Sequence, residues 1–162
     1  MKILFKNLSN NARIWIYPSN RRLSDHEIIE IKKLSDNFTE KWTAHNNKLL
    51  ASIDIPYNRF IVIGLENDFN LPSGCSIDSS VHFIQSLEKQ FNITLLDKMN
   101  VTFKQGEYLT YKSLSDFKDM VKKGSVNANT IVFNNLVSDI SGYLSDWEIP
   151  MKDSWHSRFI RS

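Results

Sequence analysis

The order of apolar patterns between Arg13 and Lys104 restricts the fold of this chain more than any other feature. A β-branched and aromatic run over residues 13–17 is followed by a helical pattern, two strand patterns, a second helical pattern and a further strand pattern. This order is typical of the ferredoxin-like, or split βαβ, arrangement, in which helices cover one face of an antiparallel sheet. We therefore predict an α+β fold, with residues 1–104 forming a ferredoxin-like unit.

Each helix in this order has sequence signals of its own. Ser24 and Glu27 have the spacing of a capping box, which predicts a first helix over residues 25–42. The second helix should extend to about residue 91, because apolar residues recur there at helical spacing. These residues are Ile77, Val81, Ile84, Leu87 and Phe91.

Residues 105–162 are expected to form a smaller extension built from a hairpin, a helix and a strand. Strand patterns over 100–104 and 107–112 flank Gln105-Gly106, Ser113 is placed to cap a short helix, and residues 130–133 are a strand pattern. The tail over 134–162 has weak periodicity but is rich in aromatic residues, so we expect it to pack down. We predict that this extension docks on the first unit.

The composition is that of an ordinary globular protein. Hydrophobic residues make up 41% of the chain and charged residues 23%, which excludes general disorder. The net charge is only +2, and basic pairs such as Lys122-Lys123 stand isolated, so we expect no nucleic-acid partner. No membrane association is expected either, because no apolar run approaches the 20 or so residues of a membrane span. The single cysteine, Cys75, excludes an internal disulfide, and the cytoplasm is the expected location.

Several segments spread along the chain resemble an uncharacterised bacterial family of about this length. They include Trp15-Ile16-Tyr17, Tyr57-Asn58-Arg59-Phe60, the stretch from Ser73 to Val81, the stretch from Thr130 to Val137, and the stretch from Ser154 to Phe159. The resemblance covers nearly the whole chain. The family is associated with Bacteroidota, and its members often carry the label "ABC transporter ATPase".

That label requires a phosphate-binding loop, G-x-x-x-x-G-K-[ST], whose backbone N–H groups and lysine hold the nucleotide phosphates. The chain has five glycines, and none of them begins this pattern. Lys122-Lys123-Gly124-Ser125 contains the residue types in another order. We therefore reject ATP hydrolysis as the function.

A second resemblance covers residues 108–147. The succession of Ser113 to Phe117, Gly124, residues 130–133 and Trp147 is similar to bacterial GYF-like modules. Those modules bind proline-rich peptides on an aromatic surface, so the resemblance implies a peptide-binding unit. The Gly-Pro that usually precedes the helix in such modules is replaced here by Lys112-Ser113.

Cys75 is the first candidate for chemistry. It follows Gly74 at the expected start of the second helix, where the helix dipole and free N–H groups favour a thiolate. Asp78, Ser79 and His82 follow three, four and seven positions later, so a continuous helix carries them on one face with Cys75. This spacing offers a nucleophile with an acid or base nearby.

The opposing interpretation is that Cys75 is a small, buried hydrophobic residue at a tight junction between loop and helix. A base two turns away is usually too far to hydrogen-bond with a nucleophile. We prefer this structural interpretation. A cysteine-dependent enzyme with His82, His45 or His156 as its base remains the alternative.

The same junction, with Ser73, Ser76 and Ser79, offers N–H and hydroxyl donors to a small anion over residues 74–79. Simple N-capping by one of these serines is the competing interpretation.

A metal site has little support in the sequence. The only histidine-containing pairs at helical i, i+4 spacing are His26 with Glu30 and Asp78 with His82, and two ligands do not make a zinc site. We predict no metal and no cofactor.

Near the carboxyl end, Trp155, His156 and Arg158 combine aromatic rings with a cation, which are residue types enriched at interface hot spots. We prefer the interpretation that this tail closes the core of its own domain, with a partner-binding tail as the alternative. Because no complete triad, metal set or cofactor fingerprint is present, the sequence favours a protein-binding or adaptor module over an enzyme. Its functional surface is expected at residues 73–82, with the tail from Trp155 to Phe159 as the second choice.

Overall fold

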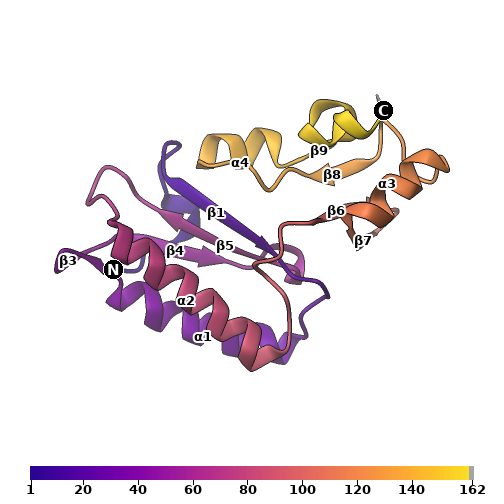
Figure 1. The fold of residues 1–162 in the computed structure, drawn as a ribbon. Helices are drawn as coiled ribbons and strands as arrows, with labels where there is room; N and C mark the ends of the chain where they lie inside the picture. Colours follow the sequence, from indigo (N-terminus) through magenta and orange to yellow (C-terminus); the bar gives the residue numbers. More distant parts are fainter. Residues whose placement is uncertain (161–162) are drawn as a thin grey trace. The chain divides into compact units, whose positions relative to one another are not determined.

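The computed structural model describes residues 1–160, and it confirms a mixed α+β fold with antiparallel sheets (Figure 1). The chain divides into two compact units. Unit 1 comprises Met1–Leu96 together with Ser138–Ser141, and unit 2 comprises Asp97–Val137 together with the chain from Gly142 onward.

Unit 1 contains a three-stranded antiparallel sheet in the order β1-β5-β4, with α1 and α2 side by side on one face of it (Figure 1). A separate two-stranded hairpin, β2–β3, follows α1. The elements are η1 (Phe5–Asn7), β1 (Arg13–Pro18), α1 (Asp25–Lys41), β2 (Thr43–Ala44), β3 (Asn47–Lys48), β4 (Ala51–Asp54), η2 (Pro56–Asn58), β5 (Phe60–Leu65) and α2 (Gly74–Phe91), where η marks a 3-10 helix.

The start of α1 is held by the predicted capping box. The Ser24 hydroxyl accepts from the Glu27 backbone N–H at 3.2 Å, and the Glu27 carboxylate accepts from the Ser24 N–H at 2.9 Å. Arg21 donates to both oxygens of that carboxylate and also to the Phe91 carbonyl, so it ties the start of α1 to the end of α2. Hydrogen bonding by Arg21 lowers the pKa of Glu27 from 4.5 to about 2.

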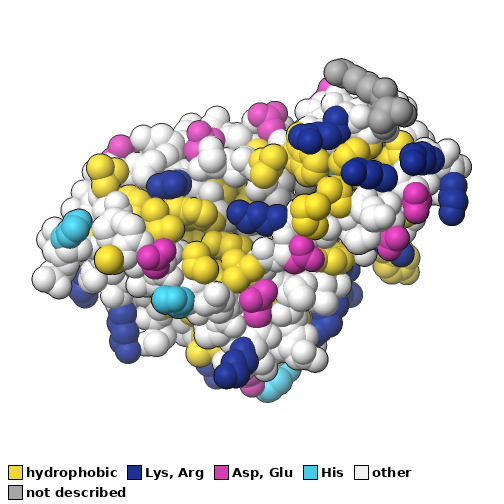
Figure 2. All heavy atoms as spheres, viewed as in Figure 1, with side chains coloured by type: hydrophobic (Ala, Val, Ile, Leu, Met, Phe, Trp, Pro, Cys, Tyr) yellow, Lys and Arg dark blue, Asp and Glu magenta, His cyan; other side chains and the backbone are white. Residues whose placement is uncertain are grey.

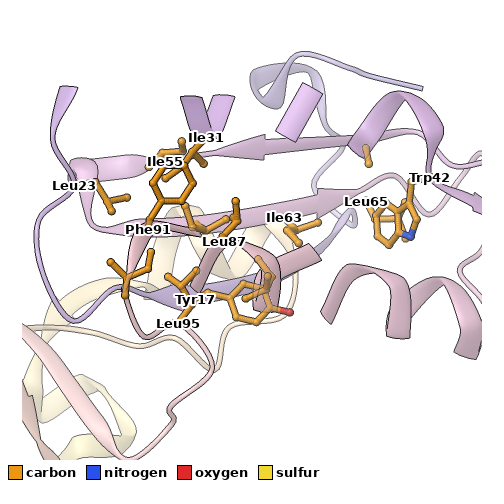
Figure 3. Close-up of a cluster of buried hydrophobic side chains, with 14 of the residues drawn as sticks. Tyr17, Leu23, Ile31, Trp42, Ile55, Ile63, Leu65, Leu87, Phe91 and Leu95 are labelled. Atoms are coloured by element: carbon orange, nitrogen blue, oxygen red, sulfur yellow. The ribbon is translucent and has the colours of Figure 1, made fainter. Parts of the chain in front are cut away.

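The core of unit 1 lies between the two helices and the sheet (Figure 3). The close-up shows Trp42 against Leu65, with Leu87 and Phe91 of α2 near Ile55. All six residues of β5 are buried, because this central strand is covered on both faces. Ile61, Ile63 and Leu65 belong to the core cluster on the helix side, so the alternating residues Phe60, Val62 and Gly64 face the other side.

Gly64 leaves room for the amino-terminal segment on that second face. A Cβ at this position would be directed into Leu8 Cδ1 and would come within 3.3 Å of Phe5 Cε2. Leu8 is itself buried, so its side chain has little space to retreat. The glycine is therefore required by packing rather than by its backbone conformation.

We expect Gly64→Ala to lower the free energy of unfolding by about 1–3 kcal/mol, the usual cost of overpacking a filled interior. Gly74→Ala is the matched control, since nothing lies within 4 Å of a Cβ there, and it should change stability by less than about 0.5 kcal/mol. Urea denaturation of the full chain measures both variants. Equal stability of the two would show that the face covered by Leu8 is loosely packed.

The fourth strand of the expected ferredoxin-like sheet does not join unit 1. The three strands present do follow the order of that arrangement. However, β6 (Asn100–Gln105) pairs with β7 (Tyr108–Ser113) and β8 (Ile131–Phe133) in a different sheet. At the outer edge of β1, a short returning segment makes an isolated antiparallel bridge between Arg13 and Asp139. The Ile14 N–H donates to the Ser138 carbonyl at 2.9 Å, so this segment occupies part of the edge of β1 that no strand pairs with.

Unit 2 contains a four-stranded antiparallel sheet in the order β7-β6-β8-β9. The predicted hairpin and short helix are confirmed: Gly106 lies in the hairpin turn with φ of +61°, and the Ser113 hydroxyl caps α3. The aromatic tail packs down as expected. Its weak periodicity did not predict the helix α4 or the strand β9. The elements are β6, β7 (Tyr108–Ser113), α3 (Leu114–Lys122), β8 (Ile131–Phe133), α4 (Ile140–Asp146), β9 (Glu148–Pro150), η3 (Met151–Asp153) and η4 (Trp155–Phe159), of which α4 begins within the segment assigned to unit 1.

The boundary between the units precedes β6 instead of following Lys104, because β6 makes all of its strand pairs in unit 2. The docking of one unit on the other stays a prediction. No helix within residues 1–160 combines the length and the hydrophobicity that crossing a bilayer requires.

Candidate functional site

The junction at residues 73–76 is a closed helix cap. The Ser73 hydroxyl accepts from the Ser76 N–H at 3.1 Å, and the Ser76 hydroxyl accepts from the Ser73 N–H at 2.7 Å. The indole N–H of Trp42 donates to the Ser76 carbonyl at 2.8 Å, which holds this turn against the core. The N-capping interpretation is therefore confirmed, and the serine hydroxyls that were candidates for holding an anion are engaged with the helix itself.

The candidate catalytic residues lie on the open face of α2. Cys75, Asp78 and His82 are all exposed, so Cys75 is not the buried junction residue that the structural interpretation expected. Ser79 donates to the Cys75 carbonyl at 3.0 Å, which is a bond within the helix. Among the described residues, no hydrogen bond joins Cys75 to a histidine. His45 lies elsewhere, exposed in the β2–β3 turn with φ of +51°.

Ser79 also lines a groove between α1 and α2. This groove has a volume of about 360 Å³ and is lined by apolar and polar side chains in nearly equal number. Phe38 and Phe83 stack across it with ring centroids 4.6 Å apart. Its lining residues are Leu34, Asn37, Phe38, Lys41, Trp42, Thr43, Ser79, Phe83 and Ser86.

The tail residues Trp155 and His156 serve the core of unit 2. His156 is only 1% exposed, its ring stacks on Trp155 at 3.9 Å between centroids, and its Nδ1 lies 2.7 Å from the Ser154 hydroxyl oxygen. Burial, followed by the positive charge of Arg158, lowers the pKa of His156 from 6.5 to about 4. A neutral, enclosed imidazole of this kind is a structural residue, which confirms the interpretation that the tail closes its own domain.

Arg158 of the same tail is exposed and borders a depression that we call the basic hollow. It is lined by Lys118 and Lys122 of α3 and by Arg158 and Phe159 of η4, and its volume is about 460 Å³. Figure 2 shows Lys and Arg side chains gathered around hydrophobic ones over α3 and the carboxyl-terminal turns. The Lys118 ammonium lies 5.5 Å from the centroid of the Phe159 ring.

The three cations of the basic hollow form no ion pair with another described residue. The acidic groups nearest in sequence are Asp116 and Asp119, which are exposed on the same helix and equally outside the ion pairs of the described chain. Three like charges at one depression repel one another, and a ligand of opposite charge would relieve that repulsion.

Of the residues in this hollow, Arg158 and Phe159 belong to the candidate tail identified from the sequence. Lys118 and Lys122 were missed, because two lysines on an amphipathic helix usually indicate a solvent-facing surface. The available signal was their i, i+4 spacing beside Phe117, which is the one buried residue of α3.

His26 and Glu30 form an exposed pair on α1, with 2.9 Å between Nε2 and Oε1. Over residues 1–160, no group of three or more His, Cys, Asp and Glu side chains is placed to hold a metal ion. Comparisons of the chain with protein-family models, with curated proteins and with solved structures found no match.

Proposed function

We propose that the protein is a binding module that holds a segment of a partner protein through anionic side chains seated in the basic hollow. The observation that carries this proposal is the convergence of Lys118, Lys122 and Arg158 on one depression without an acidic partner in the described chain. Electrostatic complementarity of this kind speeds association and selects partners by charge.

The hollow is supported from below by a rigid core. Phe159 is 9% exposed and packs against Phe117, with ring centroids 6.1 Å apart. The ring centroid of Phe117 in turn lies 5.2 Å from that of Phe103 in β6. The cations therefore project from elements that are fixed to one cluster of rings, and such pre-organisation reduces the entropy lost when a ligand binds.

A peptide test examines this proposal directly. A fluorescently labelled glutamate-rich peptide should bind the full chain, as measured by fluorescence anisotropy, and raising the salt concentration should weaken the complex. The double variant Lys118→Glu/Arg158→Glu should bind at least about tenfold more weakly, since it replaces two attractive charges with two repulsive ones.

Lys123→Glu provides the matched control. Lys123 is exposed at the end of the same helix but does not line the hollow, so its reversal alters the net charge while leaving the site intact. This variant should keep most of the affinity. Equal losses in Lys123→Glu and in Lys118→Glu alone would show general charge attraction and would contradict a defined site.

A further inference from the structure

We infer that the group held in the basic hollow is a phosphate monoester on a side chain of the partner. Binding of the partner then depends on its phosphorylation. This inference rests on the proposed function and names the ligand chemistry of the same site. It follows from the number of charges in the hollow, the fixation of Arg158 and the spacing of the two lysines.

The number of charges is the first argument. Lys118, Lys122 and Arg158 bring three positive charges to a volume of about 460 Å³. One carboxylate supplies a single negative charge, whereas a phosphate monoester carries about −1.5 to −2 and three acceptor oxygens at neutral pH. One phosphate therefore neutralises most of the hollow, which a single acidic side chain does not do.

The position of Arg158 is the second argument. Its guanidinium carbon lies 5.1 Å from the centroid of the Trp155 ring, so the aromatic side chain supports it. Trp155 is in turn held by its stack on the buried His156. A guanidinium placed over a ring keeps the N–H groups in its plane available, and their fork matches two oxygens of a phosphate.

The lysine pair is the third argument. Lys118 and Lys122 are one helical turn apart, a spacing at which like charges destabilise a helix. Within residues 1–160 neither lysine forms an ion pair with an acidic side chain, so no direct contact of that kind offsets the repulsion. A dianion between the two ammonium groups and the guanidinium would remove this repulsion, and such a ligand stabilises the folded chain that binds it.

Three peptides of one sequence test the inference, with a central residue that is phosphoserine, glutamate or serine. Anisotropy titrations with the full chain should give the tightest complex for phosphoserine, at least about tenfold tighter than for glutamate, and the weakest for serine. Arg158→Lys retains the charge but loses the planar fork, so it should reduce the preference for phosphoserine over glutamate. Lys123→Ala should leave that preference unchanged.

The outcomes separate the two proposals. Equal binding of the phosphoserine and glutamate peptides, with loss in Lys118→Glu/Arg158→Glu, would overturn the phosphate inference and leave the proposed function standing. Both proposals would be overturned if all three peptides bound equally well to the wild-type chain and to that double variant. They would also be overturned if none of the peptides bound. A thermal melt of each variant confirms that the chain remains folded.

Discussion

Replacing Phe117 with alanine is expected to unfold unit 2 selectively. Phe117 is fully buried and its ring contacts those of Phe103, His156 and Phe159, so its loss leaves a cavity at the centre of the second core cluster. Truncation of a buried phenylalanine costs about 3–5 kcal/mol. The core cluster of unit 1 shares no residue with this one, and it should remain intact.

Hydrogen exchange resolved by mass spectrometry measures this effect segment by segment. In Phe117→Ala, the amides of β6, β7 and β8 should lose protection, while those of α1, α2 and β5 keep it. Phe60→Ala is the reciprocal control, because Phe60 is equally buried but lies in β5 of unit 1. Loss of protection throughout the chain in both variants would show that the two units unfold as one.

Acidification from pH 7 to pH 4 is expected to destabilise the protein by on the order of 3 kcal/mol through His156 alone. The pKa of this residue is about 4 in the folded protein and 6.5 in the unfolded chain. Above pH 6.5 the imidazole is unprotonated in both the folded and the unfolded chain, so it does not make stability depend on pH. Between pH 6.5 and pH 4 only the unfolded chain binds the proton, so stability falls by about 1.4 kcal/mol per unit. Below pH 4 both states are protonated and the loss is complete.

His156→Asn removes this titration while its amide retains a polar group near the Ser154 hydroxyl. Denaturant titrations at several pH values should then show a flatter profile between pH 6.5 and pH 4. The loss caused by Glu27 falls in a separate window, from pH 4.5 down to about 2, because its folded pKa is lowered. If the variant does not fold, the NMR titration of His156 in the native protein is decisive, and a midpoint near 6.5 would contradict an enclosed imidazole.

Much of the local structure was predictable, because short-range signals determine it. Ser24 and Glu27 marked the start of α1, Gly106 marked the β6–β7 turn, and Ser113 marked the start of α3. Strand pairing was harder to predict. β6 pairs with β7 across a two-residue turn on one edge and with β8 on its other edge, so neither edge is left for β1. Both of these partners are much closer to β6 along the chain than β1, which lies more than 80 residues earlier, so pairing with them costs less loop-closure entropy. The order of elements alone did not reveal that competition.

The candidate site was predictable only in part, for a similar reason. The aromatic neighbours of Arg158 in the sequence indicated a candidate site. Lys118 and Lys122 gave no such signal, because lysines are common on an exposed helix face. Their significance depends on a tertiary contact between α3 and η4, which are separated by more than 30 residues. Conversely, Cys75 and His82 share a helix face as expected, but a shared face over two turns did not bring them into hydrogen-bonding contact.

The return of Ser138–Ser141 to unit 1 determines when this unit can complete its fold during synthesis. The Ile140 N–H donates to the Ala12 carbonyl at 3.0 Å and the Ser141 N–H donates to the Asn10 carbonyl at 2.9 Å. These bonds form only after the ribosome has added about 45 residues beyond Leu96, a delay of about 2–9 s at ordinary elongation rates. During this time, part of the outer edge of β1 in the nascent unit 1 lacks its hydrogen-bond partners. A fragment that stops at Leu96 would lack these backbone hydrogen bonds along β1.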